Sequence, residues 1–277
     1  MERILLAIDS QNLDENAVDF ACFLARLTES KLTAIFLDTL ISEEQVILNG
    51  DGGIPYVASA TLGAGRGDLG RSAIRNENIR LFQELADEEG IEANIYRNDG
   101  APALDVIAES MFADVLILDA KTFSGAYEGL PSRFVKDILQ DTGCPVVIAP
   151  ATFEDIDNVV FCYDGGKSSI FAMKQFSYLF PELTLKKAQV INLKGEALTA
   201  EEASGVTEWL KVHFSEVEWF IPEEEATVAL FKYLLQKKND FLVMGAYGRG
   251  LLASFFEKNP EDDTARTTSI PIFVAHY

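Results

Sequence analysis

The chain has 277 residues, enough for two domains of ordinary size, and 48% of them are hydrophobic, which provides for a sizeable core. Its formal net charge of −21 opposes binding to nucleic acid or to anionic membranes, because both need a basic surface. No apolar run approaches the roughly 20 residues of a membrane span, and Met1 leads into a strand rather than a signal peptide. These features predict a cytoplasmic protein.

The first half of the chain alternates short apolar runs, typical of buried parallel strands, with segments of helical periodicity. Strands are expected at 4–8, 32–37, 91–96, 114–118 and 145–149, and helices at 14–30, 73–89, 103–112 and 132–140. Residues 40–70 break this rhythm as a Gly-rich insertion. Its segment GRGDLG, from Gly65 to Gly70, matches a dinucleotide-binding fingerprint but follows no first strand, which favours a mobile loop.

The same order of elements begins again after a linker near residues 150–157. Strands are expected at 159–163, 188–193, 217–221, 240–244 and 270–275, and helices at 168–179, 200–213 and 223–236, with a further helix before the last strand. ILLAID matches VVFCYD, DVLILDAKT matches DFLVMGAYG, and GCPVVIA matches SIPIFVA. This internal repeat predicts an α/β fold with two tandem doubly wound, mostly parallel five-stranded sheets, in domains 1–150 and 151–277.

Candidate ligand-binding residues lie where strands end. Asp9 and Asp164 end the first strand of each half, at the edge where α/β sheets bind ligands. Their alternative role is to cap the following loop or helix. Gly245 and Gly248 follow the strand 240–244, where glycines permit a sharp turn and close approach to a phosphate. The alternative for this pair is a tight turn without a ligand.

The remaining reactive residue types form no recognisable site. Cys22, Cys144 and Cys162 are widely spaced in apolar segments, which predicts buried reduced thiols rather than a metal site. His213 and His276 stand alone, outside any catalytic or metal pattern. The sequence therefore predicts no catalytic residues and no metal, so we expect a protein that is not an enzyme.

The stretch from Asp240 to His276 resembles the end of a universal stress protein (UspA-like) domain, and the resemblance covers nearly all of the chain outside residues 40–70. Nucleotide-binding members of that family have the pattern G-x2-G-x9-G-(S/T) here. Gly245 and Gly248 match its first two positions, whereas Lys258 and Asn259 occupy the last two. Lys258 either supplies charge to a phosphate or is a solvated surface lysine.

The first half departs further from the family pattern. Asp119 and Thr122 replace the first two glycines, and Ser132 and Arg133 replace the final pair. A carboxylate at Asp119 would repel phosphate. If this chain binds ATP or another adenine nucleotide, the resemblance therefore implies one site, in the second half, near Asp164, Gly245 and Gly248.

The resemblance also implies the adenine nucleotide alpha hydrolase-like fold, with strand order 3-2-1-4-5 and an acidic residue, Asp9 or Asp164, near the adenosine. It implies that the two halves pair through their closing strands, as in homodimers of the family, and a homodimer of the chain is a further expectation. Two alternatives stay open: an interaction protein of this fold that has lost nucleotide binding, and an enzyme, which only analogy of fold supports.

Overall fold

The computed structural model describes residues 1–38, 47–49, 55–57, 66–98, 102–123, 132–194, 198–245 and 269–275. The first half of the chain contains β1 (Arg3–Asp9), α1 (Glu15–Leu27), β2 (Lys31–Leu37), β3 (Ile47–Asn49), β4 (Pro55–Val57), α2 (Arg66–Glu88), β5 (Ala93–Asn98), α3 (Pro102–Ser110), β6 (Val115–Leu118), α4 (Arg133–Asp141) and β7 (Val146–Ile148). The second half contains β8 (Asn158–Tyr163), α5 (Lys167–Leu179), a 3-10 helix (Pro181–Leu185), β9 (Lys187–Asn192), α6 (Ala200–Lys211), β10 (Val217–Phe220), α7 (Ala226–Gln236), β11 (Asp240–Met244) and β12 (Ile272–Val274).

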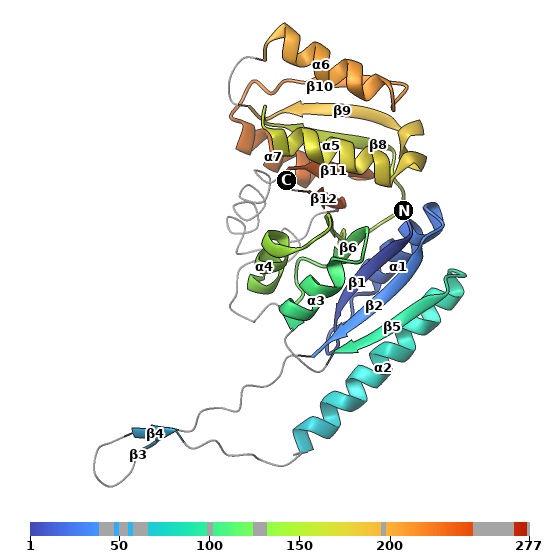
Figure 1. Ribbon diagram of the computed structural model, residues 1–277, viewed down its shortest axis with the longest axis vertical. Coiled ribbons are helices and arrows are strands. Elements are labelled where there is room, and N and C mark those ends of the chain that lie inside the picture. The colour runs from blue at the N-terminus through green and yellow to red at the C-terminus, as the bar shows by residue number, and fades with distance from the viewer. Residues whose placement is uncertain are drawn as a thin grey trace.

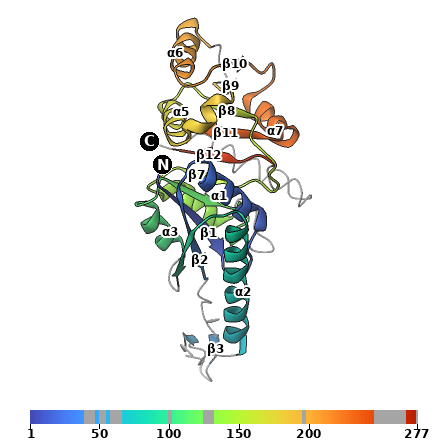
Figure 2. The ribbon, with the colours of Figure 1, turned by 90° about the vertical axis from the view of Figure 1, so that its right-hand side faces the viewer.

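Ten of these strands form one continuous sheet in the order β10-β9-β8-β11-β12-β7-β6-β1-β2-β5 (Figure 1). Within each half the strands are parallel, and their order, counted from the first strand of that half, is 3-2-1-4-5. Helices cover both faces of the sheet (Figure 2). The expected α/β fold of two doubly wound, five-stranded arrays is therefore confirmed.

Alternation along the strands divides the core into two layers. Ile4, Leu6 and Ile8 of β1 belong to the cluster that α1, α2, α5 and α6 cover. Leu5 and Ala7 of the same strand belong to the cluster that α3, α4 and α7 cover. Because both faces of the inner strands, such as β1, β6 and β11, are buried, these strands read as continuous apolar runs in the sequence, whereas the edge strand β10 alternates between half-buried and exposed residues.

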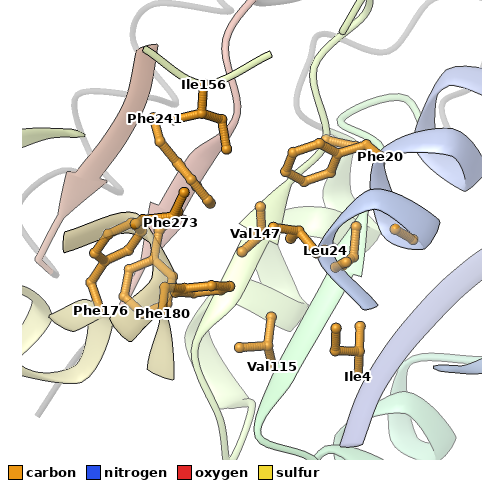
Figure 3. Packing of buried hydrophobic residues seen from close by; sticks show 14 of the residues in the cluster. Ile4, Phe20, Leu24, Val115, Val147, Ile156, Phe176, Phe180, Phe241 and Phe273 are labelled. Carbon is orange, nitrogen blue, oxygen red and sulfur yellow. The ribbon is translucent and has the colours of Figure 1, made fainter. Parts of the chain in front are cut away.

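The two halves meet where β7 and β12 pair in antiparallel register, with Val147 opposite Phe273. This is the pairing of closing strands that the family resemblance implied. On one face of the seam, Phe20 of α1 contacts Phe241 of β11, with ring centroids 6.1 Å apart. Phe273 packs on Phe176 of α5 at 5.4 Å (Figure 3). A single aromatic core therefore crosses from one half to the other.

The structure corrects the expectation for the Gly-rich insertion. Arg66 to Gly70, which were expected in a mobile loop, form the first turns of α2, so this helix begins seven residues earlier than its expected start at residue 73. Tertiary contacts farther along the helix hold it against the loop after β1: Asn78 Nδ2 donates to the Ser10 carbonyl at 2.9 Å. Within the same insertion, β3 and β4 pair as an antiparallel ribbon.

Candidate functional site

The strand order reverses between β1 and β6 in the first half and between β8 and β11 in the second. In open α/β sheets ligands bind beyond the carboxyl ends of the strands at such reversals. Asp9 and Asp119 stand at the first reversal, which we call the N-terminal switch point; Asp164 and Gly245 stand at the second, the C-terminal switch point. The topology thus places residues selected from the sequence at equivalent positions in the two halves.

Asp9 and Asp164 perform the same local task. The Asp9 Oδ1 atom accepts a hydrogen bond from the Gln11 backbone N–H at 2.9 Å, and Asp164 Oδ1 accepts one from the Gly166 N–H at 2.8 Å. Each carboxylate therefore shapes the turn that leaves the first strand, as an Asx turn does. This is the loop-capping role that was the alternative to ligand binding.

The N-terminal switch point is nearly filled by its own side chains. Asp9, Asn12, Asp14, Asp119 and Lys121 line a cavity there of about 20 Å³. That volume holds about one water molecule, far less than the several hundred Å³ of an ordinary ligand pocket. In the structure described here, this crevice has no room for a nucleotide.

The same crevice is also electrostatically unsuited to phosphate. Burial and, to a smaller extent, the nearby Asp14 carboxylate raise the pKa of Asp119 to about 6, and hydrogen bonds from the backbone N–H groups of Lys121 and Ala120 oppose this increase. Burial likewise raises the pKa of Asp9, opposed by its hydrogen bond from Gln11. Adding an anion to a site where carboxylates already resist ionisation is unfavourable.

A polar network that the sequence analysis missed covers the end of β1. Asp38, which follows β2, accepts hydrogen bonds from Ser10 Oγ and from Arg75 of α2. Gln11 Nε2 donates to the Arg71 carbonyl at 3.2 Å. Because α2 lies more than 50 residues beyond Ser10 in the chain, only the β1–β2–α2 packing brings these groups together.

The first turns of the equivalent helices α1 and α5 differ. Asp14 caps α1, and its carboxylate accepts from the N–H groups of Asn16 and Ala17. Gly166 occupies the N-cap position of α5 and provides no side-chain hydrogen bond. Lys167, the first residue of α5, carries a positive charge close to this end of the helix. The amino end of α1 is therefore neutralised by its own carboxylate, whereas that of α5 has no side-chain cap.

Connection length explains why a glycine is needed at residue 245. α1 begins six residues after Asp9, whereas α5 begins three residues after Asp164. The shorter connection brings α5 against the end of β11, so that a β-carbon at Gly245 would lie 2.5 Å from the Ser168 carbonyl carbon and 2.6 Å from the Ser169 nitrogen. No real side chain tolerates such contacts, so packing against a helix accounts for this glycine.

In the first half, the residues at the family's glycine positions have structural partners. Thr122 is buried, and its Oγ1 donates to the Asp119 carbonyl at 2.8 Å. Ser132 caps α4: its Oγ accepts from the Val135 N–H at 3.2 Å and donates to the Thr122 carbonyl at 2.5 Å. Gly248, Lys258 and Asn259, selected in the second half, lie outside the described residues, as does His276.

The three cysteines are buried and free, as expected. Burial raises the pKa of Cys22 and of Cys144 to about 12, and it also raises that of Cys162. Thiols of this kind stay protonated and are poor nucleophiles. Within the described residues, no group of three or more His, Cys, Asp and Glu side chains could hold a metal ion, and no helix is both long and apolar enough to cross a membrane.

Comparisons with known proteins agree with this architecture. No protein-family model matches the chain. Universal stress protein Slr1230 of Synechocystis is 23% identical over 292 residues, covering 98% of this chain and 99% of its own length. The crystal structure of a universal stress protein from Archaeoglobus fulgidus superposes with a TM-score of 0.64 at 15% identity, covering 99% of this chain and 98% of that one. The chain resembles the universal stress proteins over its whole length.

A shorter relative matches only part of the chain. Universal stress protein YxiE of Bacillus subtilis is 24% identical over 152 residues, which is 97% of its own length but 53% of this chain. Together with the strand order 3-2-1-4-5 in each half, these matches confirm the universal stress protein fold that the loop after β11 indicated.

Proposed function

We propose that the chain is a cytoplasmic, non-catalytic stress-response protein made of two tandem universal stress protein domains, 1–150 and 151–277, with one adenine-nucleotide site in the second. The full-length resemblance to a universal stress protein supports the class. The observation that carries the nucleotide site is the difference between the helix ends: Asp14 caps α1, while α5 begins at Gly166 with no side-chain cap.

In this proposal the phosphates of the nucleotide bind at the amino end of α5. The first N–H groups of a helix have no partner within the helix, and they favour an anion. Lys167 adds a positive charge at this end. The Lys194 side chain packs against the loop between β8 and α5: its Cδ atom would lie 3.2 Å from a β-carbon at Gly165.

The adenosine would lie toward Asp164, whose Oδ1 atom is already engaged by Gly166. Its second carboxylate oxygen would then accept a hydrogen bond from a nucleoside hydroxyl. Gly248, Lys258 and Asn259, in the loop after β11, are expected to complete the site around the phosphates.

A second candidate is an interaction protein of the same fold that binds no nucleotide. Two observations favour it. Gly245 is explained by its packing against α5, and Asp164 is explained by the turn that it forms with Gly166. Neither residue needs a ligand to account for its identity.

Calorimetric titration of ATP into the full chain tests the proposal. We expect binding with one site per chain. Lys167→Glu should weaken it at least tenfold, because it places a negative charge where the phosphates bind. Lys174→Glu is the matched control: it makes the same charge change on an exposed position of α5, two turns from the helix start, and should alter affinity less than about twofold.

Two further variants separate the candidates. Gly248→Asp should abolish ATP binding if the loop after β11 contacts the phosphates, and Asp119→Gly should leave the stoichiometry at one. Two equal sites, or affinity unchanged in Gly248→Asp, would contradict the nucleotide proposal. An absence of any ATP binding would favour the interaction protein.

A further inference from the structure

A groove between α5 and α6 lies outside both switch points. It is a cavity of about 320 Å³. The two helices cover the same face of the sheet, opposite α7 (Figure 2). The lining residues of the groove come from both helices and are mostly apolar: Ile170, Met173, Glu201, Glu202, Gly205, Val206 and Trp209. Sites for small molecules typically have volumes of about 300–1,000 Å³ and apolar walls with a few polar groups. We call this cavity the α5–α6 groove.

Gly205 is the least expected residue in this lining. It stands in the middle of α6, where a glycine costs about 1 kcal/mol relative to alanine. A β-carbon at Gly205 would have no heavy atom within 4 Å, so close packing does not require the glycine. Gly245 differs, because α5 fills the space that a side chain at Gly245 would need. Because Gly205 is one of the residues that line the α5–α6 groove, a large side chain at this position would narrow the groove.

Two carboxylates flank the groove, and they differ in what they bind. Glu202 accepts hydrogen bonds from Lys194 Nζ at 2.8 and 3.1 Å, and from Thr199, which lower its pKa to about 2. Glu201 is exposed, and among the described residues it has no hydrogen bond or ion pair. Among the residues that the structure describes, the groove lining contains no Lys or Arg. Glu201 is therefore a carboxylate that is available to a positively charged ligand.

An aromatic wall completes the groove. Trp209 lines it, and the indole packs against His213 with ring centroids 4.6 Å apart. Tyr178 of α5 contacts the same indole at 6.3 Å. These contacts hold the Trp209 ring in place. An indole face attracts a cation as well as apolar surface.

We propose that the α5–α6 groove binds a small organic cation with an apolar body, of the arylalkylammonium or alkylammonium class. The ammonium group lies beside Glu201. The apolar body lies over Gly205, against Met173, Val206 and Trp209. The net charge of −21 on the chain adds a long-range attraction for such a ligand.

Three probes with the same phenylbutyl body test the charge requirement: 4-phenylbutylammonium, 4-phenylbutan-1-ol and 5-phenylpentanoate. Calorimetry on the full chain should show the ammonium binding at least fivefold more tightly than the alcohol, and no binding of the carboxylate. Glu201→Gln should reduce the affinity for the ammonium to that for the alcohol. Equal affinities for all three probes, or no binding of the ammonium at millimolar concentration, would overturn the proposal.

A space-filling variant tests the location. Gly205→Leu should abolish binding of 4-phenylbutylammonium while raising the melting temperature, because leucine fills the groove and favours helix more than glycine does. Gly70→Leu is the matched control. Gly70 is an exposed glycine in α2, also without a heavy atom within 4 Å of its β-carbon position, so binding should be unchanged. Unchanged binding in folded Gly205→Leu would show that the groove is not the site.

Discussion

The two switch points occupy equivalent positions in one sheet but are built in different ways. At the N-terminal switch point, the six-residue step from Asp9 to α1 leaves room for the Asp119 side chain, and Asp14 caps the helix. At the C-terminal switch point, the three-residue step after Asp164 brings α5 against Gly245 and leaves the helix without a side-chain cap. The length of the connection after the first strand therefore decides whether carboxylate side chains of the chain itself fill the switch point of a repeated fold.

Exchanging the residues after β6 and β11 should produce the largest effect. Gly245→Asp must push the first turn of α5 away, because its β-carbon would meet the backbone of Ser168 and Ser169, and such overpacking costs about 3 kcal/mol. The reciprocal Asp119→Gly should change the free energy of unfolding by less than about 1 kcal/mol, because the loss of a buried charge offsets the flexibility of glycine. Urea unfolding at pH 7 measures both. Equal effects of the two substitutions would contradict the difference in helix approach.

The half-buried Asp119 carboxylate of the N-terminal switch point should give a pH-dependent effect of intermediate size. The pKa of Asp119 is raised from 3.8 to about 6, so between these values the folded chain binds more protons than the unfolded chain, and this group lowers stability as pH rises. Asp119→Asn removes that loss. It should raise the free energy of unfolding by about 1–2 kcal/mol at pH 7, since the carboxyl group is partly exposed, and by little at pH 4.

Urea unfolding of wild type and Asp119→Asn, repeated from pH 4 to pH 7, provides the measurement. The gain should appear as the pH passes through the interval from 4 to 6. A gain of the same size at pH 4 and pH 7 would mean that shape or hydrogen bonding, rather than ionisation of Asp119, is responsible.

The helix caps should give the smallest effect. Asp14→Ala removes the acceptor for two N–H groups of α1 and should cost about 1 kcal/mol in the free energy of unfolding. Asp14→Asn keeps an acceptor at the N-cap and should cost less. The two substitutions together separate the cap hydrogen bonds from the charge, and thermal unfolding by circular dichroism is sufficient to rank them. If both variants were as stable as wild type, α1 would not depend on this cap.

Much of the fold could be predicted because the apolar runs of a doubly buried sheet are legible in the sequence. The repeat of ILLAID in VVFCYD located the first strand of each half, and the alternation of strands with helices required parallel arrays. The predicted start of α2 was wrong because Gly67 and Gly70, judged by their intrinsic preferences alone, favour a loop. Long-range contacts override that preference, among them the bond from Asn78 to the Ser10 carbonyl.

The candidate site was predictable in position more than in role. The repeat placed Asp9 opposite Asp119 and Asp164 opposite Gly245, because strand ends follow from strand order. The reason for glycine at Gly245 lies in a helix more than 70 residues earlier in the chain, so no local pattern reveals it. The pairing of Asp38 with Arg75 was missed for the same reason.

The antiparallel seam between β7 and β12 has a consequence for self-association. Residues 149–157 tether the two halves, so each closing strand meets its partner at an effective concentration on the order of millimolar. A second copy of the chain could displace that partner only at a comparable protein concentration. Pairing through closing strands is therefore already satisfied within one molecule, and a homodimer of this chain would have to form through another surface.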